Sequence, residues 1–281
     1  MEELHNKLVV FQEKEIRRVW HKEEWWFVVA DVVSALTDSA DVRQYIKKMR
    51  SRDPELAKGW VQFVPLLSVE TSGGKQKLGC ANTEGIFRII QSIPSPKAEP
   101  FKQWLAKVGY ERVQEIENPE LAAERARNLY REKGYPEDWI EMRMKSIDIR
   151  SQLTDEWKIR GVKQGVEYSI LTAEISKATF GMTPKEYQEH KGLKRQNLRD
   201  HMTNLELIFS MLGEEGTRQE AIKSDAQGFP ENKTAAQKGG KAAGKALNAY
   251  EAETGKQVVT DENYLKQIEA AKKQKRIKKG G

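Results

Sequence analysis

The proline-rich step SIPSPKAEPFKQWL, residues 92–105, is the feature that most constrains how this chain can fold. Pro94 must end a preceding helix, because proline has no amide donor and its ring clashes with the turn before it. Ser95 can cap a new helix, and Pro96 suits the first helical position, where no donor is missed. Pro100 lies one turn further in, where it should cost a hydrogen bond or bend the helix. The step therefore predicts a fixed corner between two helices.

The sequence before this corner mixes strand and helix patterns. Short runs rich in β-branched and aromatic residues predict strands at 8–11, 16–20, 25–29, 60–69 and 75–81, the last two joined by a loop that turns at Gly73 and Gly74. Apolar residues at helical spacing predict three helices. These are 32–36 after Asp31, 42–49 capped by Ser39, and 86–93 capped by Asn82 or Thr83.

After the corner, nearly all of the sequence to about residue 225 has a helical pattern. The clearest repeat is spaced four, three, four, three, as in a coiled-coil seam about two heptads long; it consists of Leu198, Met202, Leu205, Phe209 and Leu212. A sustained coiled coil usually needs about three or four heptads. Packing within one chain is therefore favoured, and a homodimer through the helical region stays open as an alternative.

From residue 227 the composition changes to Ala, Gly and Lys, with few large apolar residues. Such a segment predicts an appended helix and a loose tail. The expected fold class is α+β: a small N-terminal domain of β-hairpins and helices followed by a mainly α-helical C-terminal region. The expected domains are 7–117, a helical domain at 118–225, and an Ala/Gly/Lys-rich helix with a basic, partly flexible tail at 226–281.

Composition limits where the protein can act. No apolar run reaches the roughly 18 residues of a membrane span, and the first ten residues, MEELHNKLVV, do not have the pattern of a signal peptide. Cys80 is the single cysteine and can form no internal disulfide. We therefore expect a cytoplasmic protein without a membrane partner.

No pattern of catalytic or metal-binding residues stands out. The histidines, His5, His21, His190 and His201, include no pair at helical metal-ligand spacing. Acidic residues are interleaved with Lys and Arg, as on solvated helix faces. We expect no catalytic residue, no metal and no cofactor. A metal-dependent nuclease remains the least supported alternative.

The stretch GGKAAGKA, residues 239–246, fits the G-x-x-x-x-G-K pattern of a phosphate-binding loop. Ala246 stands where that loop needs a Ser or Thr hydroxyl for magnesium, and no buried strand precedes the stretch. A better interpretation is that Lys238, Lys241 and Lys245 line one side of an Ala-rich helix. Such a stripe suits either a phosphate backbone or solvent.

Basic residues recur between positions 43 and 102. Arg43, Lys47 and Arg50 form a basic stripe one position away from the apolar face of the 42–49 helix. A basic helix beside a basic hairpin is a usual means of contacting DNA, because Lys and Arg hold the phosphates. The candidate DNA-binding residues are Arg43, Lys47, Lys48, Arg50, Lys75, Lys77, Arg88, Lys97 and Lys102.

Two blocks resemble a known domain. VWHKEEWWFVVADVVSALTDSADVRQYIKK and CANTEGIFRIIQSIPSPKAEPFKQWLAKV are similar to the Bro-N domain of baculoviral repeat proteins and prophage antirepressors. The marks of that domain fall at Trp26 to Asp31, at Glu84 to Ile90, and from Pro96 through Phe101 to Trp104. The resemblance covers about residues 7 to 112.

The remaining sequence resembles the bacterial DNA-damage-inducible protein D family, through ILTAEISKATFGMTPKEYQEHKGLKRQNLRDHMTNLELIFSMLGE, DAQGFPENKTAAQKGGKAAGKA and VVTDENYL. Together the resemblances imply a non-catalytic, DNA-binding transcription regulator of the prophage antirepressor or SOS-response type. Its DNA partner could be duplex or single-stranded. An alternative is an antirepressor or repair-protein modulator that binds a repressor or a recombination or repair protein through the helical region, with little direct DNA binding.

Overall fold

The computed structural model of the chain describes residues 15–194, 196–261, 263–265 and 270. The expected strand at 8–11 and the basic tail from residue 272 lie outside the described residues. The chain divides into two compact units, Met1–Pro119 and Glu120–Gly281. Within the described part of the chain, no helix is long and apolar enough to cross a membrane.

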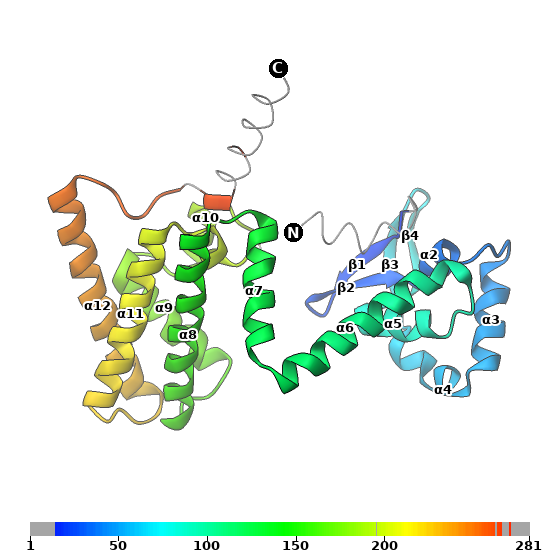
Figure 1. Cartoon of the computed structure of the whole chain (residues 1–281), viewed down its shortest axis with the longest axis horizontal. Helices are drawn as coiled ribbons and strands as arrows, with labels where there is room; N and C mark the ends of the chain where they lie inside the picture. The colour runs from blue at the N-terminus through cyan, green and yellow to red at the C-terminus, as the bar shows by residue number, and fades with distance from the viewer. Residues whose placement is uncertain (1–14, 195, 262, 266–269, 271–281) are drawn as a thin grey trace, which may run out of the picture. The chain divides into compact units, whose positions relative to one another are not determined.

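The first unit contains an antiparallel sheet with the strand order β1-β2-β4-β3 (Figure 1). The strands are β1 (Arg18–His21), β2 (Glu24–Val28), β3 (Leu66–Thr71) and β4 (Gly74–Ala81). Strand β4 pairs with β3 along its length and with β2 only at its end, where Ala81 lies opposite Phe27. The β3–β4 hairpin therefore extends beyond β1 and β2 as an arm.

Five α-helices and a short 3-10 helix complete the described part of this unit. They are α2 (Val29–Leu36), α3 (Val42–Arg52), α4 (Pro54–Phe63), α5 (Thr83–Gln91), η1 (Pro96–Ala98) and α6 (Glu99–Glu117). Large aliphatic side chains from several of these helices form one core, which includes Leu36, Met49, Leu56, Ile89 and Ile90. The α+β expectation for the first unit is confirmed.

Two local expectations for the first unit were wrong. Helix α3 is capped by Asp41, whose side chain accepts a 2.9 Å hydrogen bond from the amide of Gln44, and not by Ser39. Residues 60–63 belong to α4 and not to a strand, because Asp53 caps that helix and Pro54 occupies its first position. The expected cap at Asn82 is confirmed by its 3.0 Å bond from an amide of α5.

The proline corner forms as a fixed structure. Ser95 Oγ accepts a hydrogen bond of 3.3 Å from the amide of Lys97, which confirms the expected cap, and Pro96 begins η1. Helix α6 begins at Glu99, so Pro100 lies in its first turn. No helical donor is missing there. The expected cost of Pro100 was therefore wrong.

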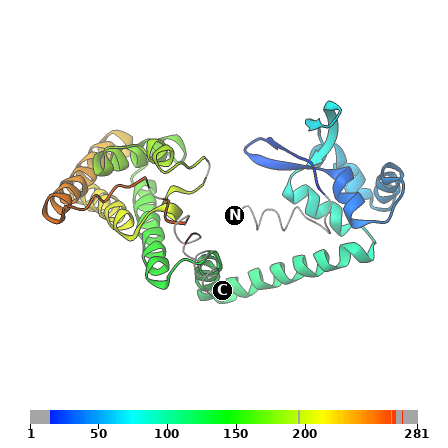
Figure 2. The ribbon, with the colours of Figure 1, turned by 90° about the horizontal axis from the view of Figure 1, so that it is seen from above.

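The second unit is helical. Its elements are α7 (Glu120–Lys133), α8 (Glu137–Ile159), α9 (Val166–Phe180), α10 (Pro184–His190), η2 (Leu198–His201), α11 (Asn204–Lys223) and α12 (Gly228–Thr254). Helix α11 packs against α8, α9 and α12, and α12 also packs against α9 (Figures 1 and 2). The mainly helical expectation for this region is confirmed.

The expected coiled-coil seam is not one continuous helix. Leu198 lies in η2, and α11 begins after Thr203, whose side chain and Glu206 form a reciprocal capping box. The cap satisfies free amide donors and sets a helix boundary in the middle of the repeat. Phe209 is buried in α11, whereas Leu212 is 44% exposed.

Helix α12 is an integral part of the second unit, which differs from the appended helix that we expected. Its glycines lie against the backbones of two neighbouring helices. A Cβ atom at Gly239 would lie 2.2 Å from the amide nitrogen of Thr217 in α11, and one at Gly244 would lie 2.4 Å from the carbonyl oxygen of Ala178 in α9. The glycines of GGKAAGKA therefore serve close helix packing.

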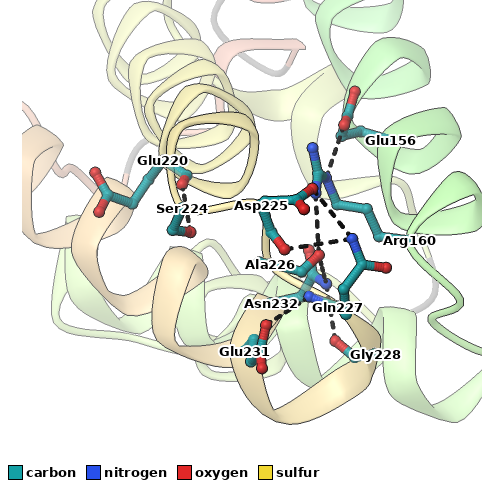
Figure 3. A network of polar contacts seen from close by, with 10 residues as sticks. All are labelled: Glu156, Arg160, Glu220, Ser224, Asp225, Ala226, Gln227, Gly228, Glu231 and Asn232. Atoms are coloured by element: carbon teal, nitrogen blue, oxygen red, sulfur yellow. Dashed lines mark hydrogen bonds and ion pairs between the residues drawn. The ribbon is translucent and has the colours of Figure 1, made fainter.

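The turn between α11 and α12 is also fixed, although we expected a domain boundary at 225/226 (Figure 3). The Arg160 guanidinium at the end of α8 donates to Asp225 Oδ1 at 3.0 Å and to the Ala226 carbonyl at 3.1 Å. The backbone carbonyl of Arg160 accepts from the amide of Gly228 at 2.7 Å. Glu156 holds the guanidinium in place at 2.7 Å. Arg160 thus holds the turn both at Asp225 and Ala226 and at Gly228, where α12 begins.

Candidate nucleic-acid interface

Helix α3 has one buried face and one exposed basic face. Met49 is buried in the core of the first unit, and Tyr45 and Ile46 pack against the same core. The helical period then directs Arg43 and Lys47 to the opposite side, where both are exposed. The helix lies at the outer edge of its unit in Figure 1. The predicted basic stripe is therefore accessible at these two positions.

The exposed cations Arg43, Lys47 and Lys48 of α3 have no acidic partner in the part of the chain that the structure describes. Among the residues that the structure describes, no carboxylate lies within 4.0 Å of the charged groups of Arg43, Lys47 or Lys48. Arg50 differs, because its guanidinium lies 5.0 Å from the centre of the Trp60 ring in a cation–π contact. The three unpaired cations of α3 are available to an anionic partner.

Lys75 and Lys77 lie on β4 at alternate positions, so they share one face of the arm. Both are exposed. Lys75 has a weak partner in Glu70, directly opposite on β3, at 3.6 Å. Figure 1 places this arm and α3 at different edges of the unit, so they form two separate basic elements.

Arg88 has a structural role. Its guanidinium binds both carboxylate oxygens of Asp53, at 3.0 and 2.9 Å, and donates to Ser92 Oγ at 2.7 Å. Hydrogen bonds from Ser92 and from the amide of Leu56, together with Arg88, lower the pKa of Asp53 to about 2. This cluster ties α5 to the junction of α3 and α4. Arg88 therefore has little capacity left for DNA.

The two candidates near the proline corner differ from each other. Lys97 forms an ion pair with Asp38, which precedes α3. Lys102 lines a shallow hollow of about 480 Å³ with Pro94, Pro96 and Glu99. Of the nine candidates, α3 brings Arg43, Lys47 and Lys48 together on its exposed side, whereas Arg88 and Lys97 are already paired within the first unit.

Sequence reasoning missed an aromatic and basic cluster on the β1–β2 hairpin. Trp20 lies directly opposite Trp25, with ring centres 5.1 Å apart in an edge-to-face arrangement. Arg18 lies 4.2 Å from the centre of the Trp25 ring. Trp20 is 39% exposed. The signal for this cluster was the hairpin register, which pairs positions 20 and 25 once the turn is placed at 22 and 23.

The structure also bears on the reactivity of the Cys80 thiol and on metal binding. Cys80 is fully buried, and burial raises the pKa of its thiol to about 11, so the reactive thiolate is disfavoured. Over the described ranges of the chain, no group of three or more His, Cys, Asp or Glu residues could hold a metal ion.

The described part of the first unit therefore has the architecture of a small α+β domain with an exposed basic helix. Residues 15–113 match the family model for the BRO family, N-terminal domain (Bro-N). The match lies within the first unit, and it confirms that part of the resemblance. No curated protein matches the sequence.

Residues 15–113 are thus similar to a Bro-N domain, and a helical unit follows them in the chain. Bro-N domains are typical of phage antirepressors and other regulatory DNA-binding proteins. The resemblance of the helical unit to the DNA-damage-inducible protein D family stays a prediction.

Proposed function

We propose that this chain is a non-catalytic, DNA-binding regulator of the phage antirepressor or DNA-damage-response type. The observation that carries the proposal is the exposed side of α3, where Arg43, Lys47 and Lys48 have no described carboxylate within 4.0 Å, inside a matched Bro-N domain. Unpaired cations on a rigid helix bind phosphates and release the counterions of DNA. The match supports DNA as the partner of this unit.

In this proposal, α3 and the β3–β4 arm each contact the DNA. Helix α3 offers its cations on a rigid support, because Met49 anchors its other face in the core. Lys75 and Lys77 on the arm add phosphate contacts from a second edge. Stacking of a base on the Trp20 and Trp25 hairpin would suit unpaired DNA, since aromatic side chains accept the face of any base.

The test is an electrophoretic titration of the full chain with duplex and single-stranded DNA at two salt concentrations. Reversing two charges in Arg43→Glu/Lys47→Glu should weaken binding at least tenfold and lower the salt slope by about 2, because each lost phosphate contact removes about one unit. Wild-type affinity and slope in this variant would refute the proposed interface.

The control is Lys163→Glu/Lys223→Glu, which changes the net charge by the same amount. Both lysines are exposed in the second unit and lie outside the elements proposed to contact DNA. This variant should keep the wild-type salt slope. An equal loss in both variants would show that overall charge, and not α3, determines binding.

A specific observation favours a second candidate, in which the helical unit binds a protein such as a repressor or a repair protein. Helices α8 and α11 border a hollow of about 770 Å³, in which Met142, Met144, Ile208 and Met211 lie among charged residues such as Glu141 and Lys145. Ile208 is 38% exposed and the nearby Leu212 is 44% exposed on the same helix. Apolar side chains gathered at an accessible groove are typical of protein-binding surfaces.

This second candidate is tested by affinity capture from DNA-damaged cells after nuclease treatment. A protein partner should survive the nuclease and be lost from Ile208→Gln/Leu212→Gln, while Lys163→Glu/Lys223→Glu retains it. Capture that disappears with nuclease alone would show bridging by DNA. Circular dichroism should first establish that the variant keeps its helical content.

The absence of catalysis is tested separately. Incubation of supercoiled plasmid with the protein and Mg²⁺ or Mn²⁺ should leave the plasmid intact. Cleavage that depends on the metal and on the protein concentration would overturn this part of the proposal.

A further inference from the structure

The second unit has a basic hollow of about 680 Å³ between the C-terminal end of α9 and the C-terminal half of α12. Its lining includes Lys177 from α9 and Lys241 and Lys245 from α12, together with His190 at the end of α10. All four side chains are exposed. Segments distant in the sequence thus place their cations around one depression.

The close packing of α9 and α12 explains why these lysines converge. Gly244 lies so near the backbone of α9 that a Cβ there would be 2.4 Å from the carbonyl oxygen of Ala178. Lys177 and Lys245 are the chain neighbours of these two contact residues, and Lys241 lies one turn earlier on α12. The glycine contact therefore fixes cations from both helices at the same rim.

Two other lysines of α12 form ion pairs with neighbouring helices. Lys233 pairs with Glu174 at 3.1 Å, and Lys238 pairs with Glu220 at 2.8 Å. By contrast, no carboxylate in the described part of the chain lies within 4.0 Å of the amino groups of Lys177, Lys241 or Lys245.

Two acids in this part of the second unit, Glu186 and Glu251, accept hydrogen bonds from backbone amides. Glu186 accepts a 2.7 Å bond from the amide of Thr183 in the capping box of α10. Glu251, which lines the hollow, accepts a 2.6 Å bond from the amide of Val258. Both carboxylates thus accept a backbone hydrogen bond, and neither forms an ion pair within 4.0 Å with Lys177, Lys241 or Lys245.

We propose that this hollow is a second DNA-contact site, which binds backbone phosphates without reading sequence. Lysine is a compact, strongly hydrated point charge that suits single phosphates. Several unpaired lysines around one depression would bind successive phosphates and release counterions. Asn248 and Gln257 in the same lining can donate further neutral hydrogen bonds to phosphate oxygens. The inference rests on the proposed function only in its choice of DNA as the polyanion.

The experiment compares the full-length wild type with Lys241→Glu/Lys245→Glu and with the milder Lys241→Gln/Lys245→Gln. Titrations with a 40-nucleotide duplex and the corresponding single strand at several salt concentrations give affinity and salt slope. The Glu variant should bind at least fivefold more weakly with a slope lower by about 2, and the Gln variant should show a smaller loss. Lys163→Glu/Lys223→Glu, with the same change in net charge, should match the wild type.

The outcomes separate this inference from the proposed function. If Lys241→Glu/Lys245→Glu keeps wild-type affinity and slope while Arg43→Glu/Lys47→Glu loses them, the hollow is not a DNA site and α3 is. If the reverse occurs, the hollow is a DNA site and the α3 proposal fails. A wild-type chain that binds neither DNA overturns both. The Gln variant covers the case in which charge reversal unfolds the unit, since wild-type affinity and slope in a folded Gln variant would refute the site.

Discussion

The packing of α12 in the second unit differs from the packing in the core of the first unit. The first unit fills its core with large aliphatic side chains, such as Leu36, Leu56, Ile89 and Ile90. The second unit brings α12 against α9 and α11 through glycine and alanine, with Gly239 almost in backbone contact with α11. Stability in the first unit therefore depends on apolar volume, whereas at α12 it depends on the absence of side chains.

The second unit also buries charge. The side chains of Lys191 and Glu206 are both fully buried, with their charged atoms 2.8 Å apart. Tyr187 donates to Glu206 Oε1 at 2.5 Å, and the amide of Thr203 donates to Oε2 at 2.7 Å. Burial, together with the nearby Glu206 charge, raises the pKa of the Tyr187 hydroxyl. Such a network is stable only while every partner is present.

The largest expected effect comes from adding one methyl group at the α12 contact. Gly239→Ala would place Cβ 2.2 Å from the Thr217 amide nitrogen, which forces the helices apart. We expect the free energy of unfolding to fall by about 4 kcal/mol, at the upper end for single substitutions. Urea denaturation followed by circular dichroism measures the loss.

The matched control is Gly109→Ala in α6, where a Cβ would meet no atom within 4 Å. The same substitution should there stabilise the helix by about 0.5 to 1 kcal/mol, because alanine has less backbone freedom to lose. Effects of the same sign at the two glycines would contradict the contrast between the units.

The next effect comes from breaking the buried ion pair. Glu206→Gln removes the carboxylate charge that lies 2.8 Å from the Lys191 amino group in a buried site. We expect a loss of about 3 kcal/mol, as is usual when one partner of a buried pair is removed. Thermal unfolding of the full chain measures it.

The double variant Lys191→Met/Glu206→Leu should recover part of that stability, because it removes both charges together but leaves the Tyr187 hydroxyl and the Thr203 amide without their acceptor. The cycle also needs the single variants Lys191→Met and Glu206→Leu. If the loss in free energy of unfolding in the double variant equals or exceeds the sum of the losses in these two, the pair has no compensating interaction and the interpretation is wrong.

A smaller effect is expected in the aliphatic core of the first unit. Ile89→Val removes one methylene from a fully buried side chain and should cost about 1 kcal/mol. The corresponding change on the surface, Ile116→Val at a residue that is 76% exposed, should cost much less. Equal losses at the two positions in chemical denaturation would argue against a volume-dependent core.

The smallest effect concerns pH. Asp53 has a pKa of about 2 in the folded chain, below the ordinary 3.8, so its stabilising contribution is present above about pH 4 and is lost as pH falls through 2. Because the hydrogen bond from Ser92 is the largest cause, Ser92→Ala should move this pKa upward. Carboxyl carbon shifts in an NMR titration measure it, and an unchanged pKa in the variant would refute the assignment.

Local sequence signals predicted part of the structure well. The proline corner, the cap at Asn82 and the strand over 75–81 all depend on a few adjacent residues, and all are present. The 60–69 strand was wrong because Asp53 and Pro54 start a helix that runs through the first apolar residues of that stretch. Propensity alone could not decide between the two.

The candidate interface was predicted only in part, for a related reason. Helical spacing was sufficient to place Arg43 and Lys47 on an exposed face. It gave no indication that Arg88 would be used by Asp53, which is 35 residues away in the chain. Whether a cation is free depends on which acids the fold brings near it.

The sequence by itself determined the α+β and helical division, the caps at Asn82 and Ser95 and the side of α3 that carries charge, because these follow from backbone rules and from a period within one element. Only the tertiary structure decided that GGKAAGKA is a packing surface and that Lys177 joins Lys241 and Lys245 at one rim. The physical reason is that close backbone approach and charge pairing depend on two elements together. The sequence of one element does not show which other element will pack against it.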